Sequence, residues 1–129
     1  MPYVNLKLTA VPSEQTTHLL GSILTDLTAD VLKKKRELTA VVVEYLASDQ
    51  WLIGAKSLAQ RAETTICLEV TVTDGTNSKD EKAEYIAKAF AALESILGPL
   101  NPASYIIIQK LRADAWGYGG MSQALRRAR

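Results

Sequence analysis

Apolar and polar residues alternate along the first stretch of the chain, where Val4, Leu6 and Leu8 fall on one side of an extended segment. Period-two alternation is typical of a half-buried strand. Over residues 13–34 the apolar positions recur at helical spacing and form one stripe: Leu19, Leu20, Ile23, Leu24, Leu27, Val31 and Leu32. Residues 40–46 then predict a second strand, buried on both faces or pressed against a helix. The first half therefore predicts the order β-α-β.

The second half repeats this order. Ile66, Leu68, Val70 and Val72 alternate as in a strand. Ser78 and Glu81 have the spacing of a capping box, which predicts a helix that ends at Gly98 and Pro99. A last strand is expected over residues 103–111. The chain thus contains two successive β-α-β units.

The two halves match at a constant offset of 65 residues from the helix onward, as in Trp51 with Trp116 and Gly54 with Gly119. The first strands match at 64, because an odd shift would turn the apolar face outward. One extra residue is therefore expected in the loop over 73–77. We predict an α+β fold: a duplicated β-α-β unit, about 1–60 and 61–129, forming one domain with a four-stranded mixed sheet and two helices on one face.

Composition narrows the function classes. The 129 residues carry a formal charge of +1, which gives no field to attract nucleic acid or a membrane surface. Neither a secretory leader nor a spanning segment is evident, so we expect a soluble, cytoplasmic protein. One cysteine (Cys67) and one histidine (His18) give no disulfide, metal site or Ser-His-Asp triad. We expect no cofactor and no metal.

Three features together resemble the tautomerase superfamily: a proline directly after Met1, an immediate β-α-β unit, and the segment DAWGYGG after the last strand. The fused, two-unit length is similar to fused 4-oxalocrotonate tautomerases and to proteins like macrophage migration inhibitory factor. These two-unit relatives assemble as trimers. The resemblance and the uncovered second face of the sheet both predict a homotrimer.

The resemblance places the functional centre at Pro2, whose secondary amine is free only after Met1 is removed. Burial or a nearby cation lowers the pKa of an amine and yields a neutral base near pH 7. Such a base can move a proton next to a carbonyl, which is tautomerisation of a small enolisable keto or enol acid. A protonated amine could instead serve a hydratase or dehalogenase, and a nucleophilic one a decarboxylase.

The positions of the two arginines of 4-oxalocrotonate tautomerase are occupied here by Pro12 and by Ala40 or Tyr105, which puts a dicarboxylate substrate in doubt. By resemblance to macrophage migration inhibitory factor, the site combines Pro2 and Lys34 with Tyr105 of a neighbouring subunit.

Trp116 would add an aromatic wall to this site, and Lys33 and Arg36 are alternatives to Lys34. Cations at a helix end and a tyrosine at an interface also have purely structural explanations. Trp51 faces Ile66, the counterpart of Pro2, so the second site should be inactive. Loss of activity altogether, leaving an assembly or interaction module, is the third possibility. The tail over 124–129 is expected to be a solvated terminus.

Overall fold

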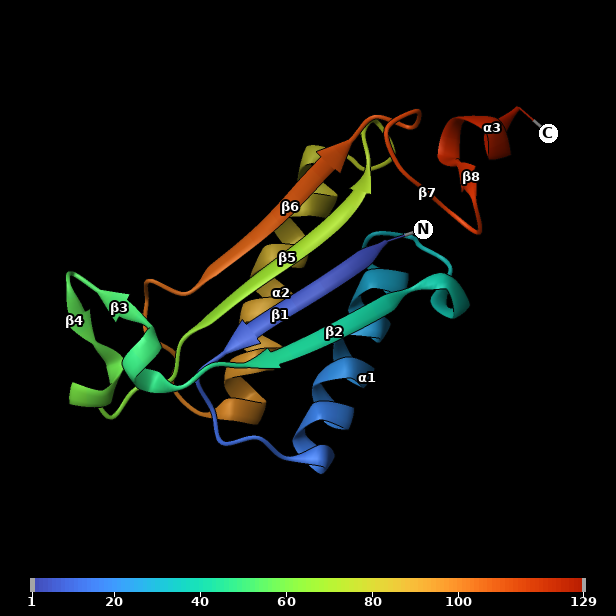
Figure 1. Cartoon of the computed structure of the whole chain (residues 1–129). Coiled ribbons are helices and arrows are strands. Elements are labelled where there is room, and N and C mark those ends of the chain that lie inside the picture. Colours follow the sequence, from blue (N-terminus) through green and yellow to red (C-terminus); the bar gives the residue numbers. More distant parts are fainter. Residues whose placement is uncertain (1, 129) are drawn as a thin grey trace.

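The computed structural model describes residues 2–128. Four strands form one mixed sheet in the order β2-β1-β5-β6. They are β1 (Tyr3–Leu8), β2 (Ala40–Tyr45), β5 (Ile66–Thr73) and β6 (Tyr105–Leu111). The pairs β1–β2 and β5–β6 are parallel, and β1 and β5 join the two units in antiparallel register. The predicted fold of two β-α-β units is confirmed (Figure 1).

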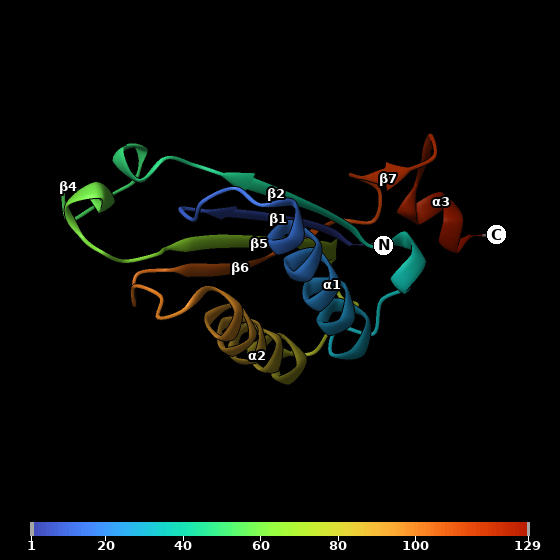
Figure 2. The same ribbon diagram turned by 90° about the horizontal axis from the view of Figure 1, so that it is seen from below.

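Both long helices, α1 (Glu14–Asp30) and α2 (Lys79–Leu97), cover the same face of this sheet, as Figure 2 shows from below. The alternating apolar residues of β1 and β5 point towards the helices and form the centre of the core: Val4, Leu6, Leu8, Ile66, Leu68, Val70 and Val72. In the helix layer, the Tyr85 hydroxyl group shares a hydrogen bond with Thr28 at 3.1 Å, and both residues are fully buried.

Serine caps set the starts of both helices. The Ser13 side chain accepts a hydrogen bond from Thr16 N, and Ser78 forms the predicted capping box with Glu81. The end of α1 differs from the sequence prediction, because the helix stops at Asp30 rather than near Lys34. Lys33 adopts a positive φ of 59°, which turns the chain away from the helix axis. The basic run after α1 therefore lies in a loop, followed by the short 3-10 helix η1 (Arg36–Leu38).

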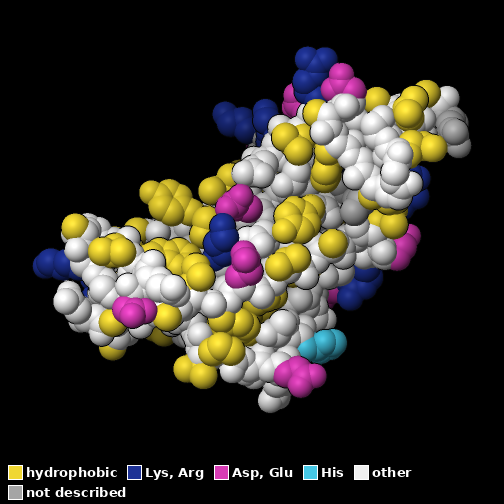
Figure 3. Space-filling view, in the orientation of Figure 1, with side chains coloured by type: hydrophobic (Ala, Val, Ile, Leu, Met, Phe, Trp, Pro, Cys, Tyr) yellow, Lys and Arg dark blue, Asp and Glu magenta, His cyan; other side chains and the backbone are white. Residues whose placement is uncertain are grey.

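The second face of the sheet is open in the single chain. Exposed residues alternate with half-buried ones along β2, so within one subunit this strand is pressed against a helix, the second of the two predicted alternatives, and is not buried on both faces. Figure 3 looks onto this face and shows apolar side chains over the strands, with a few charged side chains among them. Apolar side chains exposed here include Tyr3, Val42, Tyr105, Ile107 and Leu111.

Each unit ends in a small hairpin. The first unit has the 3-10 helix η2 (Ser48–Gln50), the strands β3 (Leu52–Ile53) and β4 (Lys56–Ser57), and the 3-10 helix η3 (Leu58–Gln60). The second has the strands β7 (Gly117–Tyr118) and β8 (Met121–Ser122) and then α3 (Gln123–Arg127). The tail is thus partly helical and is not the simple solvated terminus that we expected. The two hairpins lie at opposite ends of the sheet (Figure 1).

Candidate functional site

The start of β1 meets the ends of β5 and β6 at one edge of the molecule. Because β1 runs antiparallel to β5 and pairs Tyr3 with Thr71, the last residues of β5 lie beside Pro2. On the other side, Ala40 N donates a 3.4 Å hydrogen bond to Pro2 O. Pro2 is buried. Both views place this end of β1 next to the hairpin of β7 and β8 and next to the loop that follows α1 (Figures 1 and 2).

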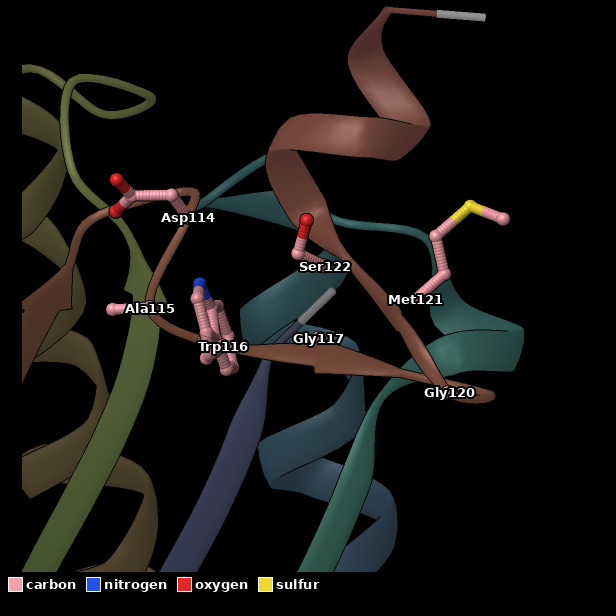
Figure 4. Close-up of a pocket in the computed structure, with 7 residues that line it drawn as sticks. All are labelled: Asp114, Ala115, Trp116, Gly117, Gly120, Met121 and Ser122. Carbon is pink, nitrogen blue, oxygen red and sulfur yellow. The ribbon is translucent and has the colours of Figure 1, made fainter.

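Trp116 lies at this edge because its indole is attached to β5. Its Nε1 donates a 3.1 Å hydrogen bond to Thr73 Oγ1. The hairpin after it can turn tightly because Gly117 has no side chain: a Cβ there would come within 2.0 Å of Met121 O. The hairpin and its approach line a shallow, open pocket of about 320 Å³ (Figure 4). Its lining consists of Asp114, Ala115, Trp116, Gly117, Gly120, Met121 and Ser122.

Lys34 reaches the same edge from the loop after α1. Its Nζ donates a 2.8 Å hydrogen bond to Thr76 Oγ1, which in turn donates to Thr73 O at 2.6 Å. Lys34 is therefore attached to the turn that joins β5 to α2, and Trp116 to the last residue of β5, directly before that turn. This turn contains the extra residue predicted from the offset between the halves.

Lys34 Nζ lies near the Glu81 carboxylate without forming an ion pair with it. Within residues 2–128 no carboxylate lies close enough to form an ion pair with its Nζ. Burial lowers the pKa of Lys34 below 10.5, and the positive charge of Arg127 lowers it further, while Glu81 opposes both effects. A half-buried ammonium group with only a neutral oxygen partner is a suitable binding group for an anionic or partly negative oxygen.

The other predicted side chains lie elsewhere in the chain. Arg36 forms an ion pair with Asp26, and more than half of its side chain is exposed. Lys33 Nζ donates to Asp30 O. Tyr105 is 66% exposed and pairs with Cys67, at the end of the sheet opposite Pro2. Within one chain, the fold thus places Pro2, Lys34 and Trp116 at one edge of the sheet and Tyr105 at the opposite end.

Sequence reasoning missed the arginines of α3. Arg126 stacks on the Tyr118 ring at 3.7 Å and donates a 2.7 Å hydrogen bond to Tyr118 O. The next residue is Arg127, whose charge acts on Lys34. The offset of 65 residues could have indicated Arg126, since it pairs this residue with Arg61, which donates to Ile53 O in the first hairpin. Because each of the two arginines donates to a carbonyl of its own hairpin, α3 is part of the repeated unit.

The counterpart of this site lies at the other end of the sheet. There the strand β5 begins at Ile66, a fully buried residue within the chain, and the hairpin of β3 and β4 follows Trp51. Ile66 N is an amide that donates to Ser104 Oγ at 3.2 Å. An amide nitrogen has no basicity near neutral pH, so this end offers no amine base.

Residues 2–128 contain no group of three or more His, Cys, Asp or Glu side chains that could hold a metal ion. No helix in this range is long and apolar enough to cross a membrane. Burial raises the pKa of the Cys67 thiol, and the Glu69 carboxylate raises it further, so this cysteine is a poor nucleophile.

Comparisons with known proteins agree with this architecture. A family model described as "Tautomerase enzyme" matches residues 2–61. A probable tautomerase K2 from Dickeya dadantii (strain 3937) is 34% identical over 65 residues, which is 49% of this chain and 96% of that protein. The relative therefore has about the length of one repeat.

Solved structures extend the likeness over both repeats. A native fused 4-OT is 20% identical with a TM-score of 0.86, and the alignment covers 95% of this chain and 97% of that one. A second fused 4-OT, described as a wild-type asymmetric trimer, is 14% identical with a TM-score of 0.85, covering 96% and 98%. At such identities these structures show the fold, whereas the sequence match to nearly all of the Dickeya protein shows the family. The chain belongs to the tautomerase family.

Proposed function

We propose that this protein is a tautomerase that uses the amine of Pro2 as a general base on a small enolisable keto or enol acid. The observation that supports this most is the position of Pro2, which directly precedes β1 at the edge that carries the Trp116 hairpin and the Lys34 loop. The proposal requires removal of Met1, which lies outside the described residues. A retained methionine would convert the amine into an amide.

Each group has a distinct part in the proposed reaction. The Pro2 nitrogen removes a proton from a carbon next to the carbonyl and returns it at the other end of the enol. Negative charge then develops on the carbonyl oxygen, and the ammonium group of Lys34 stabilises that charge. The Trp116 ring forms an apolar wall that limits access of water. Positive charge from Lys34 and Arg127 near this edge also favours the neutral form of an amine.

The cationic side chains near Pro2 limit how many carboxylate groups a substrate can carry. Pro12 and Ala40 stand where a dicarboxylate tautomerase of this family carries arginines. We therefore propose a monocarboxylate keto or enol acid as the substrate. Arg36 is the weaker candidate for a contact with it, because its guanidinium group already pairs with Asp26.

We propose that the working form is a homotrimer and that each chain is a single domain of two repeats. The open face of the sheet carries exposed apolar residues that water does not stabilise, including Val42 and Ile107. One of the fused 4-OT structures is itself a trimer. Tyr105 lies at the end of the sheet opposite the Pro2 site of its own chain. In a trimer it would therefore approach the Pro2 site of a neighbour. Light scattering tests this assembly, and a well-folded monomer would contradict it.

The function is tested with untagged protein whose N-terminus is established by intact mass. Wild type and Pro2→Ala are assayed for the conversion of phenylenolpyruvate and 2-hydroxymuconate from enol to keto form. We expect turnover of the monocarboxylate by wild type and a large loss in Pro2→Ala. Full-rate turnover by Pro2→Ala would rule out the mechanism. Retention of Met1 by the native host would favour an assembly or interaction module instead.

A further inference from the structure

Lys34 is held by a chain of hydrogen bonds that begins at Trp116. The Trp116 indole donates to Thr73 Oγ1 at 3.1 Å, and the carbonyl oxygen of the same Thr73 accepts a 2.6 Å hydrogen bond from Thr76 Oγ1. Thr76 Oγ1 in turn accepts the 2.8 Å hydrogen bond from Lys34 Nζ. The indole and the ammonium group of the proposed site are therefore connected through two threonines, one at the end of β5 and one in the turn that follows.

The Thr76 hydroxyl group is oriented for its contact with Lys34. A hydroxyl group has one proton to donate. Thr73 O is the closer acceptor for that proton at 2.6 Å, whereas Asn77 Oδ1 lies at 3.4 Å. The lone pairs of Thr76 Oγ1 therefore face Lys34 Nζ. An ammonium group has three donors, so one hydrogen bond to Thr76 leaves two donors for the oxygen atoms of a ligand.

Asn77 holds the backbone that carries Lys34 against the same turn. Its Nδ2 donates to Leu32 O at 2.8 Å, just after the end of α1. Lys33 follows with a positive φ of 59°, a strained conformation for lysine that persists only where neighbouring contacts impose it. The hydrogen bonds of Leu32 with Asn77 and of Lys34 with Thr76 lie on either side of Lys33. The turn after β5 thus sets the path of this loop and the direction of Lys34.

The corresponding turn of the first unit has no such side chains. At the offset of 65 residues, Thr76 and Asn77 correspond to Val11 and Pro12. Neither of these side chains can donate or accept a hydrogen bond, and Val11 is 85% exposed. The packing of a β-α-β unit therefore does not require polar side chains at these two positions. The polar pair occurs in the turn at the Pro2 end of the sheet, where Lys34 also lies.

We propose that Thr76 is a positioning residue, whose hydroxyl group holds the ammonium group of Lys34 in the direction needed to bind an oxygen atom of a 2-oxo acid. A lysine side chain loses conformational freedom when it is fixed, and the hydrogen bond to Thr76 imposes part of that loss before a ligand arrives. Without this bond, the ligand itself must order the side chain. Thr76 acts through Lys34 and makes no contact with the substrate. This inference rests on the proposed function, which assigns Lys34 to the substrate oxygen.

The test measures binding of benzoylformate, a 2-oxo acid that cannot enolise because it has no hydrogen on the carbon beside its carbonyl group. Calorimetric titration compares wild type with Thr76→Val and Thr76→Ser, and repeats Thr76→Val in a Lys34→Gln background. We expect Thr76→Val to bind the acid about tenfold more weakly, as for loss of a hydrogen bond to a charged group. Thr76→Ser keeps the hydroxyl group and should bind as wild type does. In the Lys34→Gln background, Thr76→Val should change the affinity less than about twofold.

Thr25→Val is the matched control. The Thr25 hydroxyl group also donates to a backbone carbonyl, Gly21 O at 2.7 Å, but within residues 2–128 it receives no hydrogen bond from a lysine. This variant should bind the acid as wild type does. If Thr76→Val does not keep the circular dichroism spectrum of wild type, Thr76→Ala removes the same hydroxyl group with less bulk and takes its place.

The outcomes separate a positioning role from a structural one. Equal affinity of wild type and Thr76→Val for benzoylformate would overturn the proposal, as would the same loss in the Lys34→Gln background or in Thr25→Val. Failure of Thr76→Ser to restore binding would also overturn it. So would wild-type affinity in Lys34→Gln, or no binding by wild type, because Lys34 would then not contact the acid. Absence of enol turnover by a wild type that binds the acid would contradict only the proposed function.

Discussion

The hydrogen bond between Trp116 and Thr73 makes a specific prediction about how the hairpin is held at the Pro2 site. Thr73→Val keeps the β-branched shape of the side chain but removes the oxygen that accepts from the indole at 3.1 Å. A neutral hydrogen bond contributes about 0.5–1.5 kcal/mol to stability. Since Trp116 is only partly buried and water can partly replace the lost acceptor, we expect a loss of about 1 kcal/mol. This corresponds to a decrease in Tm of roughly 3–6 °C for a domain of this size.

The same substitution should loosen the aromatic wall of the site. If the hairpin must close against β5 for turnover, a cost of about 1 kcal/mol lowers kcat/KM about fivefold. The fluorescence of Trp116, read in a Trp51→Phe background, should shift to longer wavelength and become more accessible to a quencher.

Thr71→Val is the matched control, because it makes the same change two residues earlier on the same face of β5. Thr71 is 7% exposed and Thr73 is 8% exposed, but the Thr71 hydroxyl group donates to Gln109 Oε1 rather than accepting from Trp116. Thr71→Val should leave Trp116 fluorescence unchanged. The reasoning fails if both variants change fluorescence and kcat/KM equally, or if neither Thr73 measurement changes.

Two further predictions concern other parts of the chain. Arg127→Gln removes a positive charge that lowers the pKa of Lys34, so the pKa of Lys34 should rise. The alkaline limb of the pH profile of kcat/KM should then move to higher pH. An unmoved limb would show that protonated Lys34 does not support turnover. Tyr85→Phe removes a buried hydroxyl group whose pKa burial raises to about 12, while Thr28 keeps its bond to Leu24 O. Urea unfolding should show a loss of about 0.5–1.5 kcal/mol with unchanged kcat/KM, and a change in kcat/KM would contradict the assignment of Tyr85 to the core.

The fold was accessible from the sequence because its signals are local. Alternation along Val4, Leu6 and Leu8 reports which face of a strand is buried, and the serine caps mark where helices begin. The end of α1 was predicted too late because apolar spacing continues through Val31 and Leu32, although the chain already leaves the helix there. A positive φ at a lysine, as at Lys33, has no signature in composition.

The candidate site was only partly accessible, because it depends on contacts between distant segments. Pro2 and Trp116 were predicted from the resemblance of the proline after Met1 and of the segment DAWGYGG to the tautomerase superfamily. The attachment of Lys34 to Thr76 could not be predicted, since it joins a loop after one helix to a turn before the other.

The central claim is that the Pro2 amine performs the chemistry, and blocking that amine alone tests it most directly. One residue that is retained before Pro2, as verified by intact mass, converts the amine into an amide without altering any other side chain. The kcat/KM for phenylenolpyruvate of this extended protein is compared with that of protein whose N-terminus is Pro2. We predict a loss of roughly 10²–10⁴-fold, the usual contribution of a general base. Equal kcat/KM for the two forms would contradict the account.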